Sequence, residues 1–432
     1  MQQTDAARVI FPCGKTDRDG APTHTNPFLI MKKTLLSLLL LATTATISAQ
    51  TLLFHTGDST GSPYRIPAIV TTCDGELVAL SDWRPCGGDI GYGHVDIVGR
   101  TSRDNGRTWS KAFKVLEGKG KGKEAGYGDA CLVADAKRKE LLLVCVSGDV
   151  PYQRSKVENS QRFVYTHGRW DKKQKAWTWD APTDLTHHIY HELLAGNVNG
   201  LFMGSGRICQ SRMVKTGRYY RLYGALCTHK GNFVLYSDDF GRSWAVLGSN
   251  VRPCVPQGDE PKCEELPDGS VVISSRKSGG RYFNIFHFRN PKTAEGEWGE
   301  AIDSREAPDG IRNEGGPCNG EILIVPARRA DGKRTRLVLQ SVPAGPGRSN
   351  VTVYWKELTS PADYDTPLHF ASNWEGSFKV TDKGSAYSTM TVQKDGRIGF
   401  FYEEEPDWYQ MIYRPLRIEE ITDGKFRATR SK

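Results

Sequence analysis

The sequence predicts an all-β fold of the β-propeller type. Three observations support this prediction: many short β-rich runs separated by turn residues, one turn pattern that occurs twice, and the lack of a long amphipathic helical period. Runs of about four to eight residues bounded by Gly, Asp, Asn and Pro are typical of strands. Sets of such strands, with a turn motif that recurs at intervals, indicate a fold built by radial repetition.

The predicted strands continue through most of the chain, and its 45 glycines and 22 prolines suit a protein rich in turns. A short helix near 187–194 is the one helical pattern that we expect. The β-rich runs lie at 66–72, 76–80, 94–102, 141–147, 218–226, 233–237, 270–275, 336–342, 351–355 and 397–404.

The repeated turn pattern is Ser-x-Asp-x-Gly-x-x-Trp, at 102–109 and again at 237–244. Its Asp can accept hydrogen bonds from turn amides, and its Gly tolerates a positive φ. The interval between the copies fits two propeller blades, and we expect degenerate copies at 165–186 and 349–357. We expect these turns to be structural and to take no part in catalysis.

The N-terminal region divides the chain into three parts. Residues 31–49 have a basic start, an apolar run and a small-residue exit, which is typical of a secretory signal peptide. The run is too short and too rich in Thr and Ser for a membrane anchor. We then expect residues 1–30 to be an unfolded upstream extension and residues 50–432 to form the propeller. Translation starts at Met1 or at Met31. We expect export to the periplasm or the medium.

Charge and cysteine content narrow the function classes. The net charge is +8, but no block of five or more Lys and Arg occurs, which argues against nucleic-acid binding. A mildly basic surface would equally steer an anionic glycan. The ten cysteines are scattered singly, without a C-x-x-C or a metal-like pairing with His. We therefore expect no metal and no cofactor.

The tetrapeptide Tyr-Arg-Ile-Pro at 64–67 precedes both copies of the turn pattern. Together these motifs, the second known as an Asp-box, resemble the bacterial exo-α-sialidases, or neuraminidases, of glycoside hydrolase family 33. The resemblance runs from Leu53 to about Glu420 with its motifs in order. It implies a six-bladed propeller and a monomer that removes terminal sialic acids from glycoproteins, glycolipids such as gangliosides, and oligosaccharides.

Three arginines match those with which the family binds the substrate carboxylate. Arg65 belongs to the Tyr-Arg-Ile-Pro motif, Arg276 ends the run EELPDGSVVISSR, and Arg348 lies in GPGRSNVTVYW. Arginine suits this task because its planar fork pairs bidentately with a carboxylate and stays charged.

A Gly-rich segment carries the expected acid. Arg84 and Asp89, in SDWRPCGGD, match a family segment with a further arginine near the sugar O4 and the acid/base aspartate. Asp82 is the nearest alternative for the acid and lies in a predicted strand. Asp129, in GYGDACLVAD, matches a family residue that helps to bind the O4 or N-acetyl region.

The resemblance implies a tyrosine nucleophile, Tyr387, with Glu260 as its activating base. A carboxylate nucleophile would meet the carboxylate on the anomeric carbon, and at ~4 Å this repulsion costs ~4 kcal/mol for an effective dielectric near 20. A neutral phenol avoids that cost. Glu264 and Glu265 compete with Glu260 for the role of base.

Glu403 matches the acid that orients the first arginine, although Glu404 and Glu405 leave that assignment ambiguous. Two rival functions remain open from the sequence. A relative could transfer sialic acid to another sugar or form an anhydro product with the same residues. A non-catalytic Asp-box propeller that binds glycans is the alternative from a different class.

Overall fold

The computed structural model describes residues 50–58, 60–406 and 409–429. These residues belong to one compact unit, Ser48–Lys432. The predicted extension (1–30) and signal peptide (31–49) lie outside the described residues and stay predictions. Among the residues described, no helix combines the length and the apolar character needed to span a bilayer.

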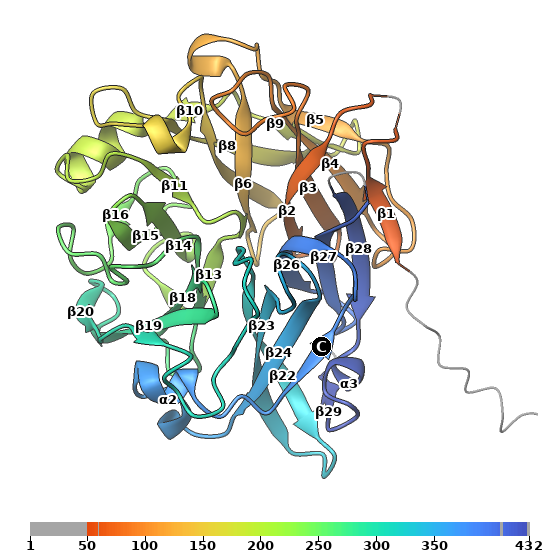
Figure 1. Cartoon of the computed structure of the whole chain (residues 1–432), viewed down its shortest axis with the longest axis vertical. Helices are drawn as coiled ribbons and strands as arrows, with labels where there is room; N and C mark the ends of the chain where they lie inside the picture. The colour runs from red at the N-terminus through yellow and green to blue at the C-terminus, as the bar shows by residue number, and fades with distance from the viewer. Residues whose placement is uncertain (1–49, 59, 407–408, 430–432) are drawn as a thin grey trace, which may run out of the picture. The chain divides into compact units, whose positions relative to one another are not determined.

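Six sheets, antiparallel except for β12 in the second sheet, follow one another around a ring, so the six-bladed β-propeller is confirmed (Figure 1). The first sheet contains β2 (Tyr64–Thr71), β3 (Leu77–Trp83), β4 (Asp96–Ser102) and β5 (Phe113–Leu116). The second contains β6 (Tyr127–Ala134), β7 (Glu140–Ser147), β8 (Arg162–Asp171), β9 (Ala176–Trp179), β10 (Thr183–Asp184) and the parallel strand β12 (Gly206–Arg207). The third contains β11 (Leu201–Met203), β13 (Cys209–Lys215), β14 (Tyr220–Thr228), β15 (Gly231–Ser237) and β16 (Ala245–Val246).

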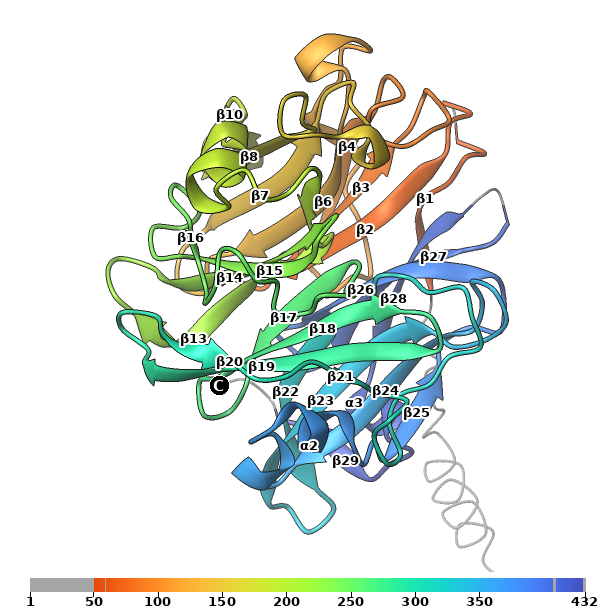
Figure 2. The ribbon, with the colours of Figure 1, turned by 60° about the vertical axis from the view of Figure 1, so that its left-hand side comes forward.

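The other three sheets complete the ring (Figure 2). The fourth contains β17 (Pro261–Glu265), β18 (Val271–Lys277), β19 (Gly280–Asn290), β20 (Glu295–Trp298) and β21 (Ile302–Asp303). The fifth contains β22 (Ile322–Arg329), β23 (Arg334–Pro343), β24 (Val351–Leu358), β25 (Gly376–Lys379) and β29 (Phe426–Ala428). The sixth contains β26 (Ser385–Val392), β27 (Ile398–Glu404), β28 (Gln410–Leu416) and β1 (Thr51–Phe54).

The sixth sheet closes the ring with strands from both ends of the described chain. β1 pairs antiparallel with β28, so the first strand in the sequence is the outer strand of the last sheet (Figure 1). The side-chain amide of Gln50 also donates a hydrogen bond to the Tyr402 hydroxyl of β27, 3.0 Å away. The ring is therefore closed by backbone hydrogen bonds between residues far apart in the sequence.

Helices are short and lie in the connections. The helix expected near 187–194 is present as η3, a π-helix over His188–Leu193. The others are η1 (Gly122–Glu124), η2 (Tyr152–Arg154), η4 (Pro361–Asp363), α2 (Pro367–Ala371) and α3 (Ile418–Ile421).

The two copies of the repeated pattern fold into the same turn, between the third and fourth strands of the first and third sheets. In the first copy, Asp104 Oδ1 accepts hydrogen bonds from the amides of Arg107 (3.0 Å) and Thr108 (2.9 Å). Gly106 has a φ of 81°, and its carbonyl accepts a hydrogen bond from the Trp109 indole. Asp239, Gly241 and Trp244 repeat these contacts in the second copy.

The two degenerate copies have different outcomes. The segment 165–186 includes the turn between β8 and β9, where Asp171 accepts hydrogen bonds from the amides of Lys173 and Gln174. At 349–357 the expectation of a degenerate turn is wrong, because Val351–Leu358 is strand β24. The chain leaves β24 through a long connection that carries η4 and α2 instead.

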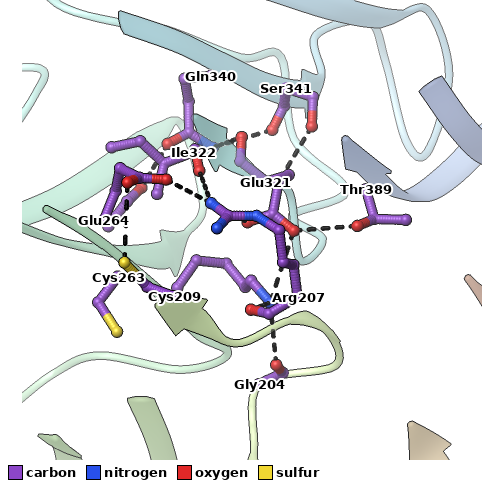
Figure 3. Close-up of polar contacts among 12 residues, drawn as sticks. Gly204, Arg207, Cys209, Cys263, Glu264, Glu321, Ile322, Gln340, Ser341 and Thr389 are labelled. Atoms are coloured by element: carbon purple, nitrogen blue, oxygen red, sulfur yellow. Dashed lines mark hydrogen bonds and ion pairs between the residues drawn. The ribbon is translucent and has the colours of Figure 1, made fainter. Parts of the chain in front are cut away.

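A buried network of charges lies among β12, β17, β26 and the start of β22, strands that contact one another (Figure 3). We call Arg207, Lys262, Glu264 and Glu321 the axial network. Arg207 contacts Glu264, and Lys262 Nζ lies 3.7 Å from Glu321 Oε2. Lys262 also donates hydrogen bonds to the carbonyls of Gly204, Ser205 and Arg207, and Thr389 donates one to Glu321. These contacts join strands of four sheets beneath the site described next.

Candidate active site

The predicted site residues converge on one face of the ring. They lie at the beginning of first strands (β2, β6, β26), just before β17, and near the end of second strands (β3, β18, β27). Since successive first strands run in the same direction, their beginnings meet at one mouth of the central channel. A pocket of about 380 Å³ opens there. Its lining includes Arg65, Ile66, Arg84, Asp89, Ile90, Asp129, Tyr152, Gln153, Gln161, Phe202, Asp259, Glu260, Arg276, Arg348 and Tyr387.

Glu403 fixes Arg65 at this mouth. The carboxylate is fully buried and accepts hydrogen bonds from Arg65 Nε (2.8 Å) and Nη2 (3.2 Å). It also accepts the backbone amides of Ile66 (2.8 Å) and Tyr387 (3.2 Å). Glu404, by contrast, pairs with Lys383 and accepts a hydrogen bond from Tyr402. Glu403 is thus the member of the acidic run that contacts Arg65.

The other two arginines predicted to bind the substrate carboxylate, Arg276 and Arg348, differ in their pairing. Together with Arg65 we call them the clamp. Arg276 Nη1 donates to Glu260 Oε2 at 2.9 Å, and its Nε lies 3.3 Å from Asp259 Oδ2. Arg348 makes no ion pair with any residue that the structure describes. Its guanidinium carbon lies 5.6 Å from the ring centre of Tyr387, as does that of Arg65. The three arginines therefore surround one tyrosine and create a positive potential at the pocket.

The expected acid and its neighbours form a second cluster around Arg84. Arg84 Nη2 lies 2.9 Å from Asp82 Oδ2 and 3.0 Å from Asp89 Oδ1. The Asp89 side chain is 57% exposed and lines the pocket, whereas the Asp82 side chain is fully buried. Burial raises the pKa of Asp82 to about 6, against the opposing charge of Arg84. Of the two candidate acids, only Asp89 can reach a bound ligand.

Asp129 lies next to this cluster, at the start of β6. Its backbone has a φ of 55°, and its amide donates a hydrogen bond to Asp82 Oδ2 at 3.3 Å. Burial and the negative charges of Asp89 and Asp82 raise the pKa of Asp129 well above its usual range. Both causes favour the protonated form of Asp129, in which the carboxyl group can donate a hydrogen bond to a ligand.

Tyr387 and Glu260 form the contact at the centre of the pocket. The Tyr387 hydroxyl donates a hydrogen bond to Glu260 Oε1, and both residues are buried. Burial and the Glu260 charge raise the pKa of Tyr387 well above its usual range, although Arg276 opposes the rise. Burial also raises the pKa of Glu260, again against Arg276.

The two competing acids lie elsewhere. Glu264 contacts Arg207 in the axial network, and Glu265 accepts a hydrogen bond from Ser211. Glu260 is the acid of this segment that contacts Tyr387, because it precedes β17 while the other two lie within that strand.

Sequence reasoning missed one wall of the pocket. Tyr152, Gln153 and Gln161 come from the connection between β7 and β8, and Phe202 comes from β11. No motif marks them. Asp259 could have been noticed, since it directly precedes Glu260. No group of three or more His, Cys, Asp or Glu suited to hold a metal occurs among the residues described.

Comparison with known proteins places this site in a family context. No family model matches the chain. The chain is 28% identical over 356 residues to a sialidase of Micromonospora viridifaciens, which covers 79% of this chain and 50% of that protein. It is 25% identical over 383 residues to a sialidase of Paraclostridium sordellii, covering 82% and 85%. The chain is a relative of the sialidases.

This sialidase relative spans about half the length of the Micromonospora protein and 64% of a Bacteroides fragilis sialidase, to which it is 23% identical. Solved structures show the same fold. A Hadza microbial sialidase superposes with a TM-score of 0.67 at 20% identity, covering 86% of this chain and 69% of that one. An intramolecular trans-sialidase from Ruminococcus gnavus gives 0.65 at 16% identity, covering 87% and 99%.

Proposed function

We propose that this protein is a retaining exo-α-sialidase that hydrolyses terminal α-linked sialic acids of glycoproteins, glycolipids and oligosaccharides. The observation that carries the proposal is the hydrogen bond from the Tyr387 hydroxyl to the buried carboxylate of Glu260, with three arginines around it. The named sialidases among the relatives support the same activity class.

Substrate binding begins with the sugar carboxylate. Arg65, Arg276 and Arg348 together offer several guanidinium N–H groups at the pocket, and each pairs well with a carboxylate oxygen. Arg348 has no anionic partner among the residues described, so it is the arginine most available to a ligand. Arg84 and Asp129 line the same pocket, where they would contact sugar hydroxyls.

In the first chemical step, the Tyr387 oxygen attacks the anomeric carbon and the glycosidic bond breaks. Asp89 gives its proton to the departing oxygen, while Glu260 takes the proton of the Tyr387 hydroxyl. Because the pKa of Tyr387 is raised and not lowered, a free phenolate does not accumulate. Proton transfer to Glu260 therefore accompanies the attack.

In the second step, water replaces tyrosine. Asp89, now ionised, takes a proton from water, whose oxygen attacks the anomeric carbon of the sialyl-tyrosine. The bond to Tyr387 breaks, and Glu260 returns the proton to the phenol oxygen. Two displacements at the same carbon give net retention of configuration. The scheme uses no metal or organic cofactor.

A second candidate function is internal transfer, in which the sugar's own hydroxyl replaces water and an anhydro sugar is released. This chain matches a solved intramolecular trans-sialidase over 99% of that chain. The match supports internal transfer as a second candidate. Product analysis by mass spectrometry separates the two reactions, because hydrolysis gives free sialic acid and internal transfer gives a product lighter by one water.

The decisive experiment is to trap the intermediate with a fluorinated sialic acid and to map the modified peptide. We expect the label on Tyr387. Label on an acidic residue, or inactivation without any covalent adduct, would contradict the proposed mechanism. A fluorogenic sialoside assay tests the activity class itself, with Tyr387→Phe as the matched inactive control.

A further inference from the structure

Arg276 is shared between two carboxylates, and only one of them has a part in the mechanism above. Glu260 occupies Nη1 of the guanidinium, and Asp259 lies at Nε, 3.3 Å away, without the alignment of a hydrogen bond. Asp259 lines the pocket, and its side chain is 50% exposed. A clamp arginine for an anionic sugar thus already faces two anions.

The carboxylate of Asp259 is held in place at the same time as it faces the pocket. Its Oδ1 accepts a hydrogen bond from the Glu260 amide at 2.9 Å and the Cys227 thiol at 3.5 Å. Its backbone carbonyl accepts the Asn232 side-chain amide at 2.7 Å and the Ser275 hydroxyl at 3.1 Å. The carboxylate therefore cannot turn away from Arg276 without losing its contacts with the Glu260 amide and the Cys227 thiol, and the backbone contacts hold Asp259 itself in place.

The contacts form a continuous line from the reacting atom outward. The Tyr387 hydroxyl donates a hydrogen bond to Glu260, and Glu260 accepts another from Arg276. Arg276 in turn forms an ion pair with Asp259. Negative charge at Asp259 offsets part of the positive charge that Arg276 presents to Glu260. Removing that negative charge leaves Arg276 freer to stabilise the anion of Glu260, and freer to attract the carboxylate of a ligand.

We propose that Asp259 is a positioning residue that divides the charge of Arg276, so that Glu260 is a stronger base toward Tyr387 and the clamp binds the sugar carboxylate less tightly. The proposal rests on the proposed function of this site. Asp259 would thus favour turnover and product release over tight binding.

The other charges around Glu260 set the direction of the expected effect. Burial raises the pKa of Glu260, Arg276 lowers it, and Asp259 adds to the rise. Glu260 must be ionised to take the Tyr387 proton, so activity rises with pH through this pKa. Titratable or charged groups face Glu260 from all the neighbouring sheets, namely Asp129, Cys227, Asp259, Arg276, Arg281, Cys318 and Tyr387.

The test is Asp259→Asn, which keeps the shape and removes the charge. We expect the acid limb of the pH profile of kcat/KM to move to lower pH by about half a unit. We expect kcat at the plateau to fall roughly three- to tenfold, because Glu260 is then a weaker base. An unsaturated sialic acid analogue serves as the ligand for binding measurements. Its dissociation constant should fall about threefold or more, because Asp259 no longer offsets the charge of Arg276. Asp259→Glu should restore part of each change.

The matched control is Asp180→Asn, which removes a similarly exposed carboxylate paired with Arg169 at 3.0 Å on the outer part of the second sheet. It should leave the pH profile and the dissociation constant unchanged. Asp259→Ser gives a second neutral variant, with the same expected direction as Asp259→Asn, should the latter fold poorly.

The outcomes separate this inference from the proposed function. If the wild type is active and Asp259→Asn has the same pH profile and the same ligand affinity as the wild type, the inference is overturned and the proposed function stands. Lower activity with weaker binding and an unmoved acid limb would also overturn it, since that pattern indicates a merely structural role. A wild type without activity on any sialoside would overturn the proposed function instead.

Discussion

The axial network and the pocket are both built from buried arginines and carboxylates, yet they differ in how completely the charges are paired. Lys262 is surrounded by three carbonyls and Glu321, and Arg207 contacts Glu264 and the Ile322 carbonyl (Figure 3). In the pocket, Arg348 has no ionic partner among the residues described. Charges that are already paired hold the sheets together, and charges left incompletely paired are available to a ligand.

Around Arg84, one part of the pocket holds more carboxyl groups than a single arginine can balance. Asp82, Asp89 and Asp129 surround the single Arg84, and the pKa values of Asp82 and Asp129 are raised. In the axial network, the Arg207 charge lowers the pKa of Glu264 against the effect of burial, whereas burial raises the pKa of Glu321. The comparison indicates that buried charges hold the sheets together where each has a partner within the protein. A charge that faces the pocket without such a partner is available to a ligand.

The largest effect is expected at the centre of the pocket. Tyr387→Phe keeps the ring and removes only the nucleophilic oxygen, so steady turnover of sialosides should fall by at least about a thousandfold. The free energy of unfolding should change little. Activity close to that of the wild type, measured with a fluorogenic sialoside, would mean that a different residue attacks.

The next effect concerns the exposed acid of the Arg84 cluster. Asp89→Ala should lower kcat/KM for natural sialosides about a hundred- to ten-thousandfold, because the leaving oxygen is no longer protonated. Substrates with leaving groups that need no proton should lose far less. The measurement is the ratio of the two losses. Equal losses for both substrate types would remove Asp89 from the role of proton donor.

A substitution in the axial network should lower the free energy of unfolding and leave the activity unchanged. Lys262→Met removes one of the two cations near the buried Glu321 and leaves Arg207 Nη2 at 3.8 Å. We expect a loss of about 3–5 kcal/mol in the free energy of unfolding. Activity per folded molecule should remain. Urea denaturation of the variant and of the double variant Lys262→Met with Glu321→Gln tests this, since the second change should recover part of the loss.

The smallest effect is expected at the clamp. Arg276→Lys retains the charge but loses the planar fork, so affinity for a sialic acid analogue should fall roughly tenfold. Calorimetric titration measures this directly, and Arg212→Lys, outside the pocket, is its control. An unchanged dissociation constant would show that Arg276 does not contact the ligand carboxylate.

Local sequence patterns predicted most of the fold. The repeats at 102–109 and 237–244 mark the first and third sheets, because Asp and Gly form the same turn wherever that pattern occurs. Two features could not be predicted this way. The pairing of β1 with β28 and of β29 with β22 depends on residues distant in sequence, and no local signal records such a partner. The strand β24 agrees with the β-rich run expected at 351–355, so only the degenerate turn expected at 349–357 is wrong.

The site shows a similar division. Tyr387, Asp89 and the arginines lie in segments with distinctive neighbours, so they could be named from the sequence. The choice among Glu260, Glu264 and Glu265 needed the structure, since only the start of β17 decides which acid faces the pocket. Phe202 has no motif at all, and it reaches the pocket only because β11 lies beside the second sheet.

The closure of the sixth sheet has a consequence for when the pocket forms during folding. Tyr387 on β26 and Glu403 on β27 belong to the sheet that is completed only when β1 joins β28. A chain still missing its C-terminal strands lacks the proposed nucleophile as well as the acid that holds Arg65. Nascent or truncated chains would therefore lack the proposed activity, which needs the completed sixth sheet.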